Sequence, residues 1–178
     1  MFADLRNFTP LAEANDPKTV VKIINAYFTE MARSIQKYSG LVLQFIGDEI
    51  EAVFGAPLWL ENHSVKAVQA ALEMRVGLNL VNDRLKMQGH TPLRHGIGIH
   101  TGKVVAANIG SPDRLSYALV GDSVNIASRI QELNKQLDTD ILMSETTQIG
   151  LDKVVPVKKL PTVTVKGKIE PISVFKAI

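Results

Sequence analysis

The sequence predicts an α+β domain in which helices pack on one face of a sheet rich in antiparallel strands. Three observations favour this class: two pairs of adjacent strand-like segments, amphipathic helices between them, and no strict alternation of strand and helix. A ferredoxin-like βαββαβ core with a C-terminal extension fits this order. With 178 residues, the chain is long enough for one domain, residues 1–178, with its own core.

The first helix is marked by its two ends. Met1–Asp4 reads as the second half of a strand, so we expect residues 1–178 to be part of a longer protein. A turn is expected over Leu5–Asn15. Asp16 can then cap a helix with Pro17 in its first position, and Gly40 lies beyond its end. Apolar residues at spacings of three or four predict its buried stripe: Val20, Ile24, Tyr27, Met31, Ile35 and Tyr38.

A hairpin and a long helix follow. Gly40–Phe45 and Glu49–Gly55 read as strands, and Ile46–Asp48 reads as the tip between them. Asn62 can cap a helix that runs to about Met87. Its expected apolar positions are Val65, Val68, Leu72, Val76 and Leu80.

The second half of the chain predicts another hairpin and one more long helix. His95–His100 alternates as a strand, and Val104–Ile109 reads as its partner across Thr101–Lys103. A helix is expected over Ser123–Lys135, capped by Asp122 or Ser123. The remaining expected elements are a strand at Ile141–Met143, a short helix after Ser144, and strands near Val154–Leu160 and Ile172–Lys176.

Composition excludes several classes of function. The chain has no cysteine, which excludes disulfides and thiolate metal sites and fits a reducing compartment, so we expect a cytoplasmic protein. A net charge of +2 gives no electrostatic reason to expect nucleic acid or an anionic membrane as a partner. We see no apolar run long enough to span a bilayer.

Two carboxylates are expected at one edge of the sheet. Asp4 ends the first strand and Asp48 lies at the hairpin tip, and the first strand of such a sheet lies beside that hairpin. Close carboxylates repel, so the pair favours a cation such as Mg²⁺ or Mn²⁺. Two such ions support phosphoryl displacement. The alternative is ordinary turn chemistry, because Asp after Gly is common in turns.

Other polar groups suggest phosphate and sugar binding. Backbone N–H groups in the turn after Asp4 can face phosphate oxygens, although no Walker A pattern is present. Asn125, Arg129 and Glu132 share one helix face, which is also what a solvated face looks like. His95 and His100 lack metal-ligand spacing, so we interpret them as structural.

Five segments in order resemble the catalytic domain of class III nucleotidyl cyclases, the adenylate and guanylate cyclases. They are "FADLRNFT", "FIGDEIEAVFG", "GIGIHTGKVVAANIG", "YALVGDSVNIASR" and "VKGKIEPISVF". Each is weak alone, but together they span nearly the whole chain. The resemblance implies a head-to-tail homodimer with two interfacial sites, ATP or GTP as substrate, and a regulatory domain in the parent chain.

The resemblance also assigns roles. Two Mg²⁺ or Mn²⁺ ions per site would bind Asp4, Asp48 and the carbonyl of Leu5. The residues that would bind phosphates are Asn7, Phe8, Thr9, Lys103 and Lys166. From the partner chain, Asn125 would orient the ribose and Arg129 would stabilise the transition state. Attack of the ribose 3′-hydroxyl on the α-phosphate would release pyrophosphate.

Two positions depart from the family pattern. Base recognition falls on Gln44 and Ala118, where adenylate cyclases have Lys with Asp or Thr, and guanylate cyclases often have Glu with a small residue. The Gln44 amide both donates and accepts, and the Ala118 side chain does neither, so we expect relaxed purine selectivity. The resemblance ranks ATP before GTP, because bacterial members of the family are most often adenylate cyclases. Two alternatives stay open: an inactive nucleotide-binding or dimerisation domain, and a diguanylate cyclase, which "GDE" at a hairpin tip suggests.

Overall fold

The computed structural model describes residues 1–163 and 171–178, and its main sheet confirms the predicted class. This sheet has seven strands in the order β2-β3-β1-β4-β7-β9-β8. Their bounds are β1 Phe2–Arg6, β2 Leu41–Ile46, β3 Glu49–Val53, β4 Arg94–Ile99, β7 Ile141–Ser144, β8 Val157–Lys159 and β9 Val174–Ala177. Among these pairs, β4 with β7 is parallel and the others are antiparallel.

Strand β1 lies between β3 and β4 in the main sheet. It pairs antiparallel with β3, where Asp4 lies opposite Glu49, and with β4, where Asp4 lies opposite Gly96. The order β4-β1-β3-β2, with α2 between β1 and β2 and α3 between β3 and β4, is the expected ferredoxin-like core. This strand order places Asp4 of β1 directly beside the β2–β3 tip.

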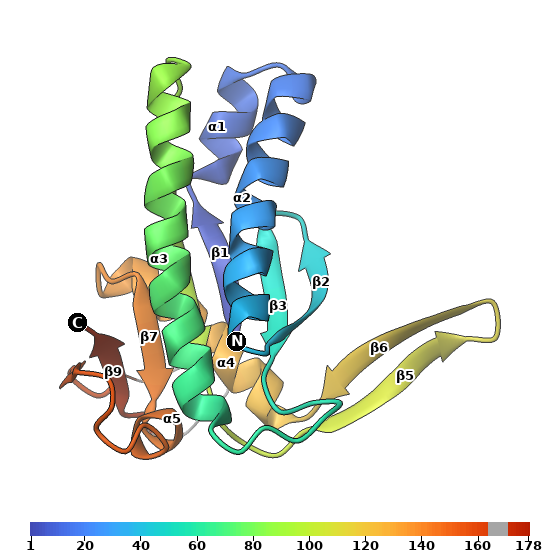
Figure 1. The fold of residues 1–178 in the computed structure, drawn as a ribbon, viewed down its shortest axis with the longest axis vertical. Coiled ribbons are helices and arrows are strands. Elements are labelled where there is room, and N and C mark those ends of the chain that lie inside the picture. Colours follow the sequence, from blue (N-terminus) through green and yellow to red (C-terminus); the bar gives the residue numbers. More distant parts are fainter. Residues whose placement is uncertain (164–170) are drawn as a thin grey trace.

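Helices cover both faces of the sheet, which corrects the expectation that they lie on one face. The helices are α1 Phe8–Ala14, α2 Pro17–Lys37, α3 His63–Met87, α4 Asp122–Gln136 and α5 Glu145–Ile149. Figure 1 shows α2 and α3 side by side in front of the sheet and α4 behind it. The main core cluster joins α2 and α3 to Ile97 and Ile99 of β4. On the opposite face, a Cβ at Gly98 would lie 2.2 Å from the backbone nitrogen of Gln131 in α4.

The predicted starts of the two long helices are confirmed, and the predicted apolar stripe of α3 is right at Val65, Val68 and Leu72 but wrong in its second half. Asp16 caps α2 by accepting hydrogen bonds from the amides of Lys18 and Thr19. In α3, Val76 and Leu80 are half exposed, whereas small residues and other apolar side chains are buried. The buried set includes Ala67, Val68, Ala70, Ala71, Met74, Leu78, Val81 and Leu85. Alanines let α3 pack closely, and their small side chains weaken the sequence signal.

The expected pairing of the fourth strand with the next segment is wrong. Strand β5 (Val105–Ser111) pairs with β6 (Arg114–Val120) in a separate two-stranded sheet, not with β4. Strand β6 was not predicted, although Pro112 and Asp113 are typical turn residues between two strands. We call β5 and β6 the arm, and Figure 1 shows it extending away from the rest of the molecule.

The arm leaves apolar side chains in solvent. Val105 is 65 % exposed and Leu115 is 62 % exposed, and Ile109 and Val120 are also exposed. An isolated two-stranded ribbon is marginally stable in water. The arm is thus an apolar surface without a partner in the described chain. Within residues 1–163 and 171–178, no helix combines the length and apolar character that crossing a bilayer requires.

Candidate active site

The β2–β3 hairpin brings the two predicted metal aspartates together. Gly47 has φ +63°, a left-handed conformation that glycine adopts without strain, and it turns the chain into Asp48. Asp4 lies inside β1 and not at its end as predicted, and it is the last residue of β1 that pairs with β3. Asp48 lies close enough to Asp4 for the two side chains to interact electrostatically and by a hydrogen bond. The predicted carboxylate pair is therefore present at one edge of the sheet.

Both carboxyl groups carry raised pKa values. Burial, and next the charge of Asp48, raise the pKa of Asp4 to about 6. Burial also raises the pKa of Asp48. Burial and the charges of Asp4, Glu51, Asp48 and Glu132 raise the pKa of Glu49 to about 7. Among the described residues, no cation is a named partner of these three carboxyl groups, so negative charge accumulates here, which is the setting that a divalent cation relieves.

The donor set fits a hard cation that keeps room for other ligands. Asp4 and Asp48 offer carboxylate oxygens, and the carbonyl of Leu5 belongs to the same strand as Asp4. Among the described residues, no group of three His, Asp or Glu is arranged to hold a metal by itself. Mg²⁺ is usually bound by one or two carboxylates together with water and substrate phosphates, so two aspartates are the expected protein contribution.

The segment predicted as a turn after β1 forms a short helix. Asn7 adopts a left-handed conformation with φ 59° and precedes α1. Phe8 packs against the core, whereas the side chains of Asn7 and Thr9 are exposed. The first amides of a helix have no partner within the helix. The backbone N–H groups of Asn7, Phe8 and Thr9 are therefore suited to donate hydrogen bonds to phosphate oxygens.

Helix α4 carries the predicted polar face. Asn125 and Glu132 are exposed, and Arg129 is partly buried. The expected side-chain cap is wrong: the helix begins after Gly121 without one. Ser123 instead donates a hydrogen bond to the carbonyl of Lys103, at 2.9 Å. This contact ties the start of α4 to the segment between β4 and β5.

Asn125 and Arg129 of the α4 face are not joined to the carboxylate pair, although Glu132 lies close enough for its charge to raise the pKa of Glu49. Within the described residues, no hydrogen bond or ion pair links Asn125 or Arg129 to Asp4 or Asp48. The predicted phosphate ligand Lys166 lies outside the described residues. One chain therefore presents two separate sets of candidate groups.

Gln44, the predicted base-recognition residue, has a hydrogen-bond partner that was not predicted from the sequence. Gln44 on β2 lies opposite Glu51 on β3, and its Nε2 donates to a Glu51 carboxylate oxygen at 2.7 Å. The signal was present in the sequence, because a two-residue tip at Gly47 and Asp48 sets position 44 opposite 51. The second predicted base residue, Ala118, lies on the arm opposite Ala107.

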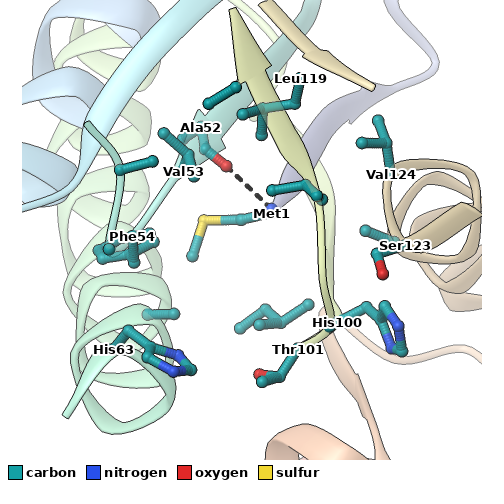
Figure 2. Close-up of a pocket in the computed structure, with 18 of the residues that line it drawn as sticks. Met1, Ala52, Val53, Phe54, His63, His100, Thr101, Leu119, Ser123 and Val124 are labelled. Carbon is teal, nitrogen blue, oxygen red and sulfur yellow. Dashed lines mark hydrogen bonds between the residues drawn. The ribbon is translucent and has the colours of Figure 1, made fainter. Parts of the chain in front are cut away.

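A cavity of about 650 Å³ lies beside Glu51. Figure 2 shows it between Met1, the end of β3, His63 of α3 and Ser123 of α4. The Met1 amine donates to the carbonyl of Ala52 at 2.9 Å along its wall. Of the predicted site residues in the described chain, only Lys103 lines it. The cavity is thus adjacent to the base-recognition position and separate from the aspartates.

His95 lies in β4 and His100 directly follows that strand, and each ring lies within hydrogen-bond distance of a neighbouring hydroxyl. His95 is buried, and its Nδ1 lies 3.4 Å from the hydroxyl of Tyr27. Burial lowers the pKa of His95 to about 4, so the ring is neutral at physiological pH. His100 shares a hydrogen bond with Ser144 through its Nδ1, at 2.9 Å.

Comparison with known proteins identifies the family. Residues 1–176 match the model of the adenylate and guanylate cyclase catalytic domain. Adenylate cyclase 1 of Rhizobium meliloti is 30 % identical over 100 % of this chain, but the chain spans only 27 % of that protein. The guanylyl cyclase Cya2 is 38 % identical with a TM-score of 0.92, covering 99 % of this chain and 88 % of that one.

The fold matches an adenylyl cyclase equally well. The structure of CyaB from P. aeruginosa has a TM-score of 0.93 at 29 % identity, covering 99 % of this chain and 91 % of that chain. The order of elements, the paired aspartates beside the hairpin tip and the family match agree with one another. The chain belongs to the family of adenylate and guanylate cyclase catalytic domains.

Proposed function

We propose that this domain converts a purine nucleoside triphosphate into the 3′,5′-cyclic monophosphate and pyrophosphate. The observation that carries the proposal is the convergence of Asp4 and Asp48 beside the β2–β3 tip, with raised pKa values and no balancing cation among the described residues. In the reaction, the ribose 3′-oxygen loses its proton and attacks the α-phosphate. The bond from the α-phosphorus to the bridging oxygen breaks, and pyrophosphate leaves.

Asp4, Asp48 and the carbonyl of Leu5 would hold two Mg²⁺ or Mn²⁺ ions. Bound there, such ions lower the pKa of the attacking hydroxyl and neutralise phosphate charge. The residues proposed for the phosphates are the amides of Asn7, Phe8 and Thr9 together with Lys103 and Lys166. These groups would fix the triphosphate so that the leaving oxygen lies in line with the attacking one.

Asn125 and Arg129 would act from a second copy of the chain. Two observations support this: neither residue contacts the aspartates within the described chain, and the arm exposes apolar side chains that a partner would cover. Asn125 would orient the ribose. Arg129 would bind the charge that develops at the α-phosphate, which lowers the barrier because the interaction is strongest in the transition state. A head-to-tail homodimer would then have two sites.

The base is read at Gln44 and Ala118 in this proposal. The adenylate cyclase relative from Rhizobium meliloti supports ATP, as ranked from the sequence. The hydrogen bond between Gln44 and Glu51 supports GTP as the second candidate, because it restrains the amide that would otherwise accept either purine. The likeness to a guanylyl cyclase agrees with that candidate.

Partial coverage of the curated relatives supports a longer parent protein. The chain spans 27 % of the adenylate cyclase from Rhizobium meliloti and 36 % of that from Anabaena cylindrica. We infer that residues 1–178 form the catalytic domain of a protein with a regulatory domain, acting in signal transduction in the cytoplasm.

The proposal is tested by measuring product directly. The chain is incubated with Mn²⁺ and either ATP or GTP, and cyclic AMP, cyclic GMP and dinucleotide products are separated by chromatography. Cyclic mononucleotide well above an Asp48→Ala control supports the proposal. No product above that control would indicate an inactive nucleotide-binding or dimerisation domain, and a dinucleotide product would indicate a diguanylate cyclase.

A further inference from the structure

Glu51 lies where it can control the orientation of the Gln44 amide. The two residues are directly opposite on adjacent strands, and the Gln44 Nε2 donates to Glu51 at 2.7 Å. Glu51 is only 6 % exposed, whereas Gln44 is exposed. The carboxylate is therefore held by the sheet, and the more mobile amide must adapt to it.

A carboxylate leaves the amide one orientation. Carboxylate oxygens only accept hydrogen bonds, while an amide donates through nitrogen and accepts through oxygen. A flip of Gln44 would place its carbonyl oxygen against the Glu51 oxygen and leave a buried acceptor without a donor. The nitrogen of Gln44 therefore faces Glu51, and its carbonyl oxygen is left to face a ligand.

The pair also carries negative charge at the surface that meets the base. A hydrogen bond from an amide to a carboxylate polarises the amide and makes its carbonyl oxygen a stronger acceptor. The Watson–Crick edge of guanine offers two adjacent donors, N1–H and the 2-amino group. Adenine offers one amino donor next to N1, whose lone pair is repelled by an acceptor. The chemistry of this pair thus matches guanine better.

We propose that Glu51 is a positioning residue that fixes the Gln44 carbonyl oxygen toward the base and gives the site a preference for GTP. The inference rests on the proposed cyclase function. It replaces the relaxed selectivity that Gln44 and Ala118 alone predict with a preference, and it places GTP before ATP. It assigns Glu51 no contact with the reacting atoms. Loss of Glu51 therefore changes the choice of base while the chemistry at the phosphates continues.

The test compares kcat/KM for GTP and ATP in the parent and in Glu51→Gln, both as the full chain with Mn²⁺. The parent is expected to prefer GTP. In Glu51→Gln the new amide accepts either face of Gln44, so the GTP/ATP ratio should fall about tenfold, mainly through KM for GTP. Glu145→Gln removes an exposed acidic side chain elsewhere and should leave the ratio unchanged.

An exchanged pair separates positioning from a general effect on folding. In the double variant Gln44→Glu/Glu51→Gln, the amide at position 51 donates to the carboxylate at position 44, which still presents an acceptor to the base. The GTP preference should return to at least the parent ratio. If Glu51→Gln does not fold, as judged by thermal unfolding, the exchanged pair and Glu51→Met carry the comparison.

Two outcomes overturn the proposal: a parent that prefers ATP, or a GTP/ATP ratio that Glu51→Gln leaves unchanged. Absence of any product from the parent contradicts the proposed function instead. Equilibrium binding of Mn²⁺–GTP and Mn²⁺–ATP to the parent and Glu51→Gln then replaces turnover. The same tenfold change in the ratio of dissociation constants is expected, and equal ratios overturn the inference.

Discussion

The carboxylate corner and the α4 face differ in how completely one chain builds them. Asp4 and Asp48 are brought together by paired strands, and the electrostatics of each depends on the other. Asn125 and Arg129 lie on α4 and have no hydrogen bond or ion pair to Asp4 or Asp48 within the described residues, and they lie near an arm whose apolar side chains are exposed. Under the proposed function, the fold of one chain would supply the metal ligands, whereas binding of the transition state would depend on assembly of two chains.

The largest expected effect on activity comes from removing one residue of the aspartate pair or one residue of the α4 face. Asp48→Ala and Arg129→Ala should each lower kcat by about 10³-fold, because one loses a proposed metal ligand and the other the charge that stabilises the transition state. Mixing the two variants should restore activity, since a mixed dimer contains one intact site. About a quarter of the parent activity is expected for random pairing in a symmetric dimer, measured as cyclic nucleotide formed.

The control is each variant alone at the same total concentration. A mixture that remains as inactive as its components would place both residue sets in one chain and remove the contrast between the two regions.

A large loss of stability is expected where α4 packs on the sheet. Gly98→Ala places a Cβ 2.2 Å from the Gln131 nitrogen and 2.5 Å from the Ala127 carbonyl oxygen, both backbone atoms that cannot move aside. The free energy of unfolding should fall by about 3 kcal/mol, measured by urea denaturation.

The matched control is Gly89→Ala. Gly89 has φ +79° with nothing near its Cβ position, so only conformational strain of about 1 kcal/mol is expected. Equal losses in the two variants would contradict close packing of α4.

The next expected effect is a pH dependence of stability that is linked to His95, which is buried in the folded protein. The pKa of His95 is lowered by burial to about 4, against about 6.5 in an unfolded chain. The stability linked to neutral His95 is fully present above pH 6.5. It is lost as pH falls toward 4, because the unfolded chain binds the proton first, and the loss is up to about 3 kcal/mol.

The measurement is the free energy of unfolding of the parent minus that of His95→Gln at several pH values. Other titrating groups, including Asp4, cancel in this difference. A difference that stays constant from pH 7 to pH 4 would show that His95 is solvated in the folded protein.

The smallest effect on stability is expected in the arm. Leu115 is 62 % exposed, so Leu115→Asp should change the free energy of unfolding by about 0.5 kcal/mol or less. If the arm is part of the dimer interface, the same change should shift sedimentation toward monomer and lower specific activity at low protein concentration. The control is Glu13→Asp, at an exposed position outside the arm, which should change neither sedimentation nor activity. Thr9 is also exposed, but it is unsuitable as a control because it is a proposed phosphate ligand.

Most elements were predictable because their signals are local. Asp16 and Pro17 marked the start of α2, and Gly47 with Asp48 marked the hairpin tip. The arm was not predicted, since strand pairing depends on contacts that periodicity does not encode, and β5 was assigned to the nearest earlier strand. The second covered face was also missed, although glycines at positions 96 and 98 are the places where α4 approaches the sheet.

The site divides in the same way. The approach of Asp48 to Asp4 followed from strand order, which the sequence pattern determined. The hydrogen bond from Gln44 to Glu51 required the cross-strand register, and a residue that acts through another has no motif of its own. No contact between Arg129 and the aspartates occurs in the described chain, and the proposed dimer is what would bring them together.

The register of the β2–β3 hairpin has a consequence for how the family can change. Leu43 is an extra residue in β2, a bulge between the pairs Val42 with Ala52 and Gln44 with Glu51, and pairing runs unbroken from there to the tip. One inserted residue at the tip would turn Gln44 to the opposite face and displace Asp48 together with it. Substitution at positions 44 and 51 can therefore change the base preference without moving Asp48, whereas a change in the length of this loop would alter base recognition and the proposed metal site together.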